Sequence, residues 1–152
     1  MIQQRVDLVN IIAQDARSPV LISSLTPSAG FSMSDGLVLP SPIIIIDGAV
    51  FMWDVDGPND KDFSWQGFNV DKLKIFETCM PRPEMLLVGT GSKMLFPPPA
   101  FKKYLNGLGI QVDVQDSRNA SSTYNLLAEE GRKVAAALYP ISDLSAKTGL
   151  RE

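Results

Sequence analysis

The sequence predicts an α/β domain, and three observations support that class. Residues 20–68 alternate short apolar runs with turn residues, which is typical of antiparallel strands. Residues 85–138 alternate strand-like and helix-like patterns in the order strand, helix, strand, helix. The composition, 45% hydrophobic and 20% charged over 152 residues, suits a globular chain of one domain. We therefore expect a β-rich N-terminal half joined to a βαβα C-terminal half.

The first half contains four apolar runs and a strong turn signal. Residues 20–22 precede a turn over residues 26–30, and residues 36–39 lead into Pro40. Residues 43–46 are followed by Asp47 and Gly48, a pair that favours a two-residue hairpin turn, and then by a further apolar run. These patterns predict antiparallel sheet in this half.

The second half begins with a buried strand over residues 85–88, which Gly89-Thr90-Gly91 closes. Three prolines at residues 97–99 lead into a predicted helix over residues 100–108. Residues 110–114 alternate apolar and polar side chains, as in a strand with one polar face. The two strands should be parallel neighbours that are joined through the helix.

A final helix is predicted to begin after Asn119 or Ser121 as its N-cap and to end before Pro140. Its apolar face contains Tyr124, Leu127, Ala128, Gly131, Val134, Ala135 and Leu138. On that face Gly131 should contact the sheet, so Gly131→Leu should destabilise the domain by roughly 1–3 kcal/mol. Residues 20–140 then form a single domain, with a peripheral N-terminal segment over residues 1–19 and a tail over residues 141–152.

Composition excludes several classes of function. The chain has no histidine and a single cysteine, Cys79, so it lacks the imidazole of most nucleophile pairs and the ligands of most zinc and iron–sulfur sites. The net charge of −3 disfavours nucleic acid as a partner. No apolar run is long enough to span a bilayer, and residues 1–17 show neither a signal peptide nor a clear transit peptide, so a leader is either not used or already removed. We expect a protein without catalytic residues, metal or cofactor, which works by binding other proteins.

Gly89, Thr90 and Gly91 form one candidate site, because backbone N–H groups between a strand and a helix can hold an anion. The glycine pattern of dinucleotide-binding loops does not follow, so a plain tight turn is the favoured interpretation. The polar loop from Asp116 to Thr123 could hold a ligand beside it, although helix capping explains the same residues.

Four aspartates follow Trp53 without the spacing of a calcium loop, which indicates a solvated turn (Asp54, Asp56, Asp60 and Asp62). Four aromatic residues surround this loop: Trp53, Phe63, Trp65 and Phe68. Core packing is the favoured interpretation of these rings. A partner-binding surface is the alternative, with Trp65 and Phe68 as candidate interface anchors. Cys79 has no neighbouring base in the sequence and is interpreted as a structural cysteine.

Two segments carry a family resemblance. Residues 83–91 read Pro-Glu-Met-Leu-Leu-Val-Gly-Thr-Gly, and residues 123–132 read Thr-Tyr-Asn-Leu-Leu-Ala-Glu-Glu-Gly-Arg. In combination they resemble the Mth938-like domain family, and within it the mitochondrial branch that assists assembly of respiratory complex I. The resemblance covers residues 20–140 and implies a mixed central sheet with an added β layer.

The resemblance also implies a non-catalytic assembly factor or scaffold for complex I, in the mitochondrial matrix or at the matrix face of the inner membrane. Its partners would be subunits of assembly intermediates and a second assembly factor, and peripheral membrane association is compatible with this role. The alternative is a small-molecule or anion-binding domain of a bacterial, cytoplasmic type. Thr123, Tyr124 and Asn125 join Gly89 to Gly91 as the candidate ligand or partner loop. Family members often carry Cys and Arg where this chain has Ser121 and Ser122, so no thiol-dependent role is expected.

Overall fold

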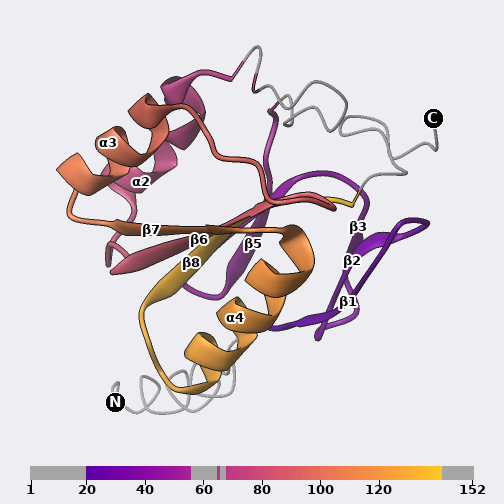
Figure 1. The fold of residues 1–152 in the computed structure, drawn as a ribbon. Helices are drawn as coiled ribbons and strands as arrows, with labels where there is room; N and C mark the ends of the chain where they lie inside the picture. Colours follow the sequence, from indigo (N-terminus) through magenta and orange to yellow (C-terminus); the bar gives the residue numbers. More distant parts are fainter. Residues whose placement is uncertain (1–19, 56–64, 66–67, 142–152) are drawn as a thin grey trace, which may run out of the picture.

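The computed structural model describes residues 20–55, 65 and 68–141, and these residues form two sheets with helices on both sides of the larger one (Figure 1). The strands are β1 (Ile22–Thr26), β2 (Gly30–Met33), β3 (Val38–Leu39), β4 (Ile43–Ile46), β5 (Ala49–Met52), β6 (Met85–Thr90), β7 (Gln111–Gln115) and β8 (Val134–Tyr139). The helical elements are the 3-10 turn η1 (Val70–Leu73) and the α-helices α2 (Ile75–Thr78), α3 (Pro99–Gly107) and α4 (Ser117–Glu129).

The central sheet is mixed and has five strands in the order β5-β4-β8-β6-β7. Strands β6, β7 and β8 are parallel to one another, whereas β4 is antiparallel to both β5 and β8. A smaller antiparallel sheet has the order β1-β2-β3. The expected antiparallel pairing of the first half is therefore confirmed, but β4 and β5 belong to the central sheet rather than to the sheet of β1.

Apolar side chains fill a separate core on each face of the central sheet. Helices α2 and α3 cover one face, and α4 with the small sheet covers the other (Figure 1). Neighbouring residues of β4 alternate between the two cores: Ile44 packs with Phe101 of α3, and Ile45 packs with Tyr124 of α4. All four residues of β4 are buried, which is why this strand is a continuous apolar run without polar alternation.

Two local predictions are confirmed. Asp47 and Gly48 both adopt positive φ angles, 50° and 79°, and join β4 to β5 as a two-residue hairpin. Met85 to Gly89 pair in parallel with Gln111 to Gln115, and α3 lies between the two strands in the chain. The prolines work as expected, because Pro99 is the first residue of α3 and Pro98 is its N-cap.

The predicted long final helix is wrong. Helix α4 ends at Glu129, and Val134–Tyr139 is not helix but strand β8, in the middle of the central sheet. Gly131 ends the helix: its φ is 82°, its N–H donates to the Ala128 carbonyl, and the Arg132 N–H donates to the Leu127 carbonyl. This pair of hydrogen bonds is a Schellman motif. The second half is therefore βαβαβ, and Pro140 follows a strand.

Two further details of that prediction change with it. A Cβ atom on Gly131 would meet nothing within 4 Å, so this glycine does not contact the sheet and Gly131→Leu would not overpack an interface. The N-cap of α4 is Asp116 rather than Asn119 or Ser121, since the Asp116 carboxylate accepts the Asn119 N–H at 2.9 Å. The helix begins directly after β7, which leaves no polar loop between the two elements.

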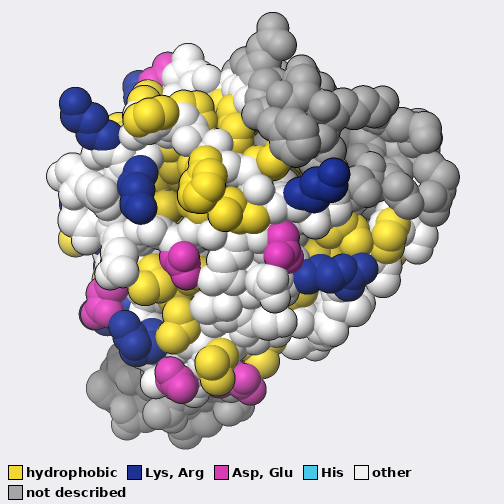
Figure 2. All heavy atoms as spheres, in the orientation of Figure 1, with side chains coloured by type: hydrophobic (Ala, Val, Ile, Leu, Met, Phe, Trp, Pro, Cys, Tyr) yellow, Lys and Arg dark blue, Asp and Glu magenta, His cyan; other side chains and the backbone are white. Residues whose placement is uncertain are grey.

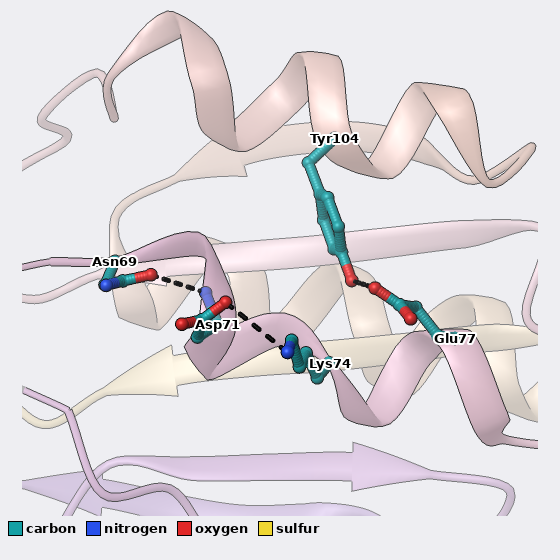
Figure 3. Close-up of polar contacts among 5 residues, drawn as sticks. All are labelled: Asn69, Asp71, Lys74, Glu77 and Tyr104. Carbon is teal, nitrogen blue, oxygen red and sulfur yellow. Dashed lines mark hydrogen bonds and ion pairs between the residues drawn. The ribbon is translucent and has the colours of Figure 1, made fainter.

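Helices α2 and α3 are linked on their outer side (Figure 3). The Tyr104 hydroxyl of α3 donates a hydrogen bond to the Glu77 carboxylate of α2. Burial, followed by this hydrogen bond, raises the pKa of Tyr104 to about 12.

The turn η1, which precedes α2, has its own polar contacts (Figure 3). Asn69 caps η1, and Lys74 lies 3.7 Å from Asp71 in an exposed ion pair.

Candidate functional site

Gly89, Thr90 and Gly91 lie at the carboxyl end of β6, where α4 begins. A Cβ atom on Gly89 would lie 2.7 Å from Leu138 Cδ2 and 2.9 Å from both Cα and Oγ of Ser117. The missing side chain therefore lets the first turn of α4 pack directly on the sheet. Gly91 has a φ of 100°, a conformation that favours glycine, and it turns the chain away from the strand.

Ser117 connects three segments at this end of the sheet. Its hydroxyl donates to the Tyr139 carbonyl of β8 and accepts the Gly91 N–H at 2.8 Å. Its own N–H donates to the Gly91 carbonyl, also at 2.8 Å. Ser117 is fully buried, so these bonds satisfy polar groups that water does not reach.

Thr90 organises the loop that follows β6. Its hydroxyl accepts the Leu95 N–H at 3.0 Å and lies within hydrogen-bonding distance of the carbonyls of Lys93 and Gln115. The side chain is buried, and its donor and acceptor capacity is used within the chain. Thr90 thus closes the turn rather than presenting a hydroxyl to a ligand.

The start of α4 carries its own negative charge. The Asp116 carboxylate accepts the backbone N–H of Asn119 and, at 2.6 Å, its side-chain amide. A carboxylate at this position occupies the place where a helix N-terminus would attract an anion. Because the Gly91 N–H is also engaged, this end of the sheet is built for internal packing, which agrees with the turn and capping interpretations of both loops.

Thr123, Tyr124 and Asn125 lie on α4, and their side chains contact two different parts of the chain. The Thr123 hydroxyl donates to the Gln115 side chain at 3.1 Å. The Asn125 amide makes a two-sided contact with Ile22 at the start of β1: it accepts the backbone N–H and donates to the carbonyl, both at 2.9 Å. Asn125 therefore joins the small sheet to α4, whereas Thr123 contacts Gln115, whose carbonyl also lies near the Thr90 hydroxyl.

Tyr124 is buried between α4 and the start of the small sheet. Its hydroxyl donates to the Val20 carbonyl at 3.2 Å. Burial raises the pKa of Tyr124 to about 12, because a phenolate would lose its hydration there. The residue also forms part of the wall of a cleft at the opposite end of the sheet.

That cleft has a volume of about 490 Å³ and lies where β8 begins and β4 ends. Its apolar lining comes from Ile46, Pro81, Pro83, Tyr124, Ala128 and Val134, and its charged residues are Asp47, Glu129, Arg132 and Lys133. Sequence analysis did not find this cleft. The only local signal was the Asp47-Gly48 turn, since residues 131–134 were read as part of a helix.

Trp65 and Phe68, the candidate interface anchors, pack in the aromatic part of the core beneath α3. The Trp65 ring lies 5.5 Å from Phe68, 5.8 Å from Phe101 and 5.6 Å from Tyr139 between ring centroids. Trp65 is buried and Phe68 is partly buried against the same cluster. These contacts are those of core aromatics, and a role at an interface stays a prediction.

The remaining candidates are the residues of the acidic loop, Cys79 and Ser121. Asp56, Asp60, Asp62 and Phe63 lie outside the described residues. Among the residues that are described, no three of Cys, Asp and Glu group as metal ligands. The Cys79 thiol is partly buried and contacts the Phe76 carbonyl at 3.7 Å. Ser121, at the position where relatives were expected to carry a thiol, donates to the Ser117 carbonyl inside α4.

The face of the molecule drawn in Figure 2 carries charges of both signs. In the view of Figure 2, Lys and Arg side chains are interspersed with Asp and Glu. A nucleic-acid site would require clustered positive charge.

In residues 20–55, 65 and 68–141, no helix has both the length and the apolar character needed to cross a bilayer.

A mixed five-stranded sheet, packed between helices on one face and a helix with a small β layer on the other, defines the class: an Mth938-like α/β domain. A Bordetella pertussis structure described as an Mth938-like domain has the same fold, with a TM-score of 0.63 over 80% of this chain and 85% of that chain at 23% identity. Residues 24–139 match a family described as proteins of unknown function (DUF498/DUF598), and the chain belongs to this family.

Named relatives are found among animal proteins. The chain is 35% identical over 113 residues to a Xenopus tropicalis protein named NADH dehydrogenase (ubiquinone) 1 alpha subcomplex assembly factor 3. That match covers 74% of this chain and 57% of the frog protein. A Danio rerio protein of the same name is 32% identical over 138 residues, which cover 91% of this chain and 74% of the fish protein. The chain thus spans between about half and three quarters of the length of these relatives.

Proposed function

We propose that this chain is an assembly factor of mitochondrial respiratory complex I and that it acts by binding other proteins. The observation that carries the proposal is the identity of 32% over 91% of the chain with a relative named as a complex I assembly factor. The match extends over 138 residues, so the proposal applies to most of the chain.

The site geometry supports binding rather than catalysis. The chain has no histidine, and the predicted ligand loop is filled by its own hydrogen bonds through Ser117 and Thr90. The two tyrosines with perturbed pKa values, Tyr104 and Tyr124, use their hydroxyls in bonds that hold elements together. At this end of the sheet the Gly91 N–H and the Thr90 hydroxyl are already engaged within the chain, which does not favour an anion-binding function.

The finer proposal concerns partners and place. We expect subunits of complex I assembly intermediates and a second assembly factor as partners, in the matrix or at the matrix face of the inner membrane. The mixed charge on the face drawn in Figure 2 suits protein partners better than nucleic acid.

A deletion strain tests the proposal. Loss of the protein should lower the amount of full-sized complex I on native gels, while NADH oxidation per assembled complex stays unchanged. Expression of the wild-type chain should restore the amount. A normal amount of full-sized complex in the deletion strain would contradict the assembly role, and full-sized but inactive complex would indicate a direct part in turnover instead.

A further inference from the structure

The two edges of the central sheet differ in how they are protected. Strand β7 forms one edge and carries Gln111, Asp113 and Gln115 at alternate positions, so a charge and two amides discourage the addition of another strand. Strand β5 forms the other edge and reads Ala-Val-Phe-Met. It contains no charge and no proline, and its pairing with β4 runs without a bulge.

The outer side of β5 offers free backbone groups. The Trp53 N–H donates to the Pro42 carbonyl at 2.8 Å, which sets the alternation along the hairpin: Trp53, Phe51 and Ala49 turn their N–H and C=O groups toward β4. Val50 and Met52 therefore turn theirs away from the sheet. Within the described part of the chain, no residue forms a hydrogen bond with these outward groups.

The side chains of β5 are exposed although they are apolar. Phe51 is 44% exposed and Met52 is 67% exposed, on opposite faces of the strand. An edge of this kind, with free backbone groups and apolar side chains on both faces, is the template used when a partner adds a strand to a sheet.

The charged residues beside β5 indicate what kind of segment would bind to its outer edge. Asp47 and Asp54 are both exposed and stand at the two ends of β5. One possible occupant is the β5 strand of a second copy of this chain. If the two strands paired antiparallel with Phe51 opposite Phe51, Asp54 of one copy would lie opposite Gly48 of the other copy and therefore next to its Asp47. Like charges would then meet at both ends, which disfavours a second copy as the occupant.

We propose that the outer edge of β5 binds an extended, uncharged apolar segment of a partner protein that is flanked by Lys or Arg. The segment pairs with the N–H and C=O groups of Val50 and Met52, and its basic flanks face Asp47 and Asp54. That the partner takes part in complex I assembly rests on the proposed function. The binding of such a segment to β5 does not depend on it.

The binding test uses the full chain and two synthetic peptides. One has alternating Val and Thr between Lys pairs, and the other has Glu pairs in place of Lys. The Lys peptide should bind in fluorescence anisotropy and should slow amide hydrogen exchange at Val50 and Met52, whereas the Glu peptide should bind at least tenfold more weakly. Equal affinity for both peptides, or protection confined to β7, would overturn the proposal.

Variants distinguish the contribution of the β5 backbone to peptide binding from that of its side chains. Met52→Pro removes the outward N–H and should weaken the Lys peptide at least tenfold, while Met52→Ala keeps the N–H and should change affinity less than threefold. Asp47→Asn with Asp54→Asn should weaken binding severalfold and reduce its salt dependence. Gln111→Lys on β7 is the control at the opposite edge and should have no effect. If Met52→Pro does not fold, Met52→Lys and the exchange data decide the matter.

Two further outcomes distinguish this inference from the proposed function. Wild-type dimers in sedimentation that Met52→Lys abolishes would overturn the proposal in favour of a second copy as the occupant. A folded Met52→Pro chain that fails to bind the Lys peptide yet restores complex I in the deletion strain would overturn the role of this edge in assembly and leave the proposed function standing. A deletion strain with normal complex I would contradict the proposed function and leave the peptide result untouched.

Discussion

The two ends of strands β6 and β8 are built in opposite ways. At the carboxyl end, Gly89 lets α4 approach so closely that the buried Ser117 hydroxyl bonds both Gly91, which follows β6, and Tyr139 of β8. At the amino end, the same helix leaves a cleft of about 490 Å³ beside Tyr124. The end with the glycine-rich sequence is closed, and the end without a recognisable motif is open. A glycine pattern can therefore mark close packing as readily as a ligand site.

The largest expected effect comes from adding one methyl group at the closed end. Gly89→Ala would place a Cβ atom within 3 Å of Ser117 backbone and of Leu138, so the free energy of unfolding should fall by about 3 kcal/mol. Chemical denaturation measures this change. Gly107→Ala is the matched control, because its Cβ would meet nothing within 4 Å, and it should leave the midpoint unchanged or slightly higher. Equal effects at the two glycines would show that α4 does not pack on β6 as closely as described.

A smaller effect is expected from the hydroxyl that joins the strands. Ser117→Ala would leave the Gly91 N–H and the Tyr139 carbonyl without this buried partner, and it should cost about 2 kcal/mol. Ser121→Ala serves as the control, since that buried hydroxyl only donates to a carbonyl within its own helix and should cost less than about 1 kcal/mol. If Ser117→Ala lowered the free energy of unfolding no more than Ser121→Ala does, the Ser117 hydrogen bonds would not stabilise the closed end as described.

The smallest effect is expected at the open end and depends on pH. Tyr124→Phe removes one hydrogen bond to Val20 and should cost about 1 kcal/mol at neutral pH. The folded-state pKa of Tyr124, about 12, lies above the ordinary value of 10.0. Its contribution is therefore present below pH 10 and is lost as the pH rises from 10 through 12, where the unfolded chain ionises first.

Urea denaturation between pH 9 and pH 12 measures this dependence. The wild-type chain should lose stability more steeply with pH than Tyr124→Phe does, and Tyr104 contributes to both curves equally. Parallel curves for the two proteins would show that the Tyr124 hydroxyl is hydrated in the folded state.

Several elements could be predicted because their signals are local. The Asp47-Gly48 turn follows from the backbone freedom of these residues, and Pro99 opens α3 because its missing N–H is not needed there. The apolar runs at residues 43–46 and 85–88 are both predicted as strands, the second of them buried, and both are inner strands of the central sheet. Core packing is the favoured interpretation of Trp65 and Phe68, and both rings lie in the aromatic cluster beneath α3, while their role as interface anchors stays a prediction.

The error at the final helix has an identifiable physical cause. Residues 134–138 read Val-Ala-Ala-Ala-Leu, and alanine favours a helix in isolation. In the folded chain these small side chains allow β8 to lie between β4 and β6 with α4 on one face and α3 on the other. Tertiary burial outweighs local propensity here, and Gly131 provides the point at which the helix can end.

The sequence by itself determined the α/β class, the parallel pair β6 and β7, the hairpin of β4 and β5 and the family resemblance, because each depends on spacing within a short window. Only the tertiary structure decided that β8 completes the central sheet, that Ser117 closes its carboxyl end, and that β5 is left as an apolar edge between two aspartates. The place of β8 and the bonds of Ser117 depend on contacts between residues that are distant in the chain, and β5 is an edge because no other strand pairs with its outer side. A local pattern encodes none of these long-range relations.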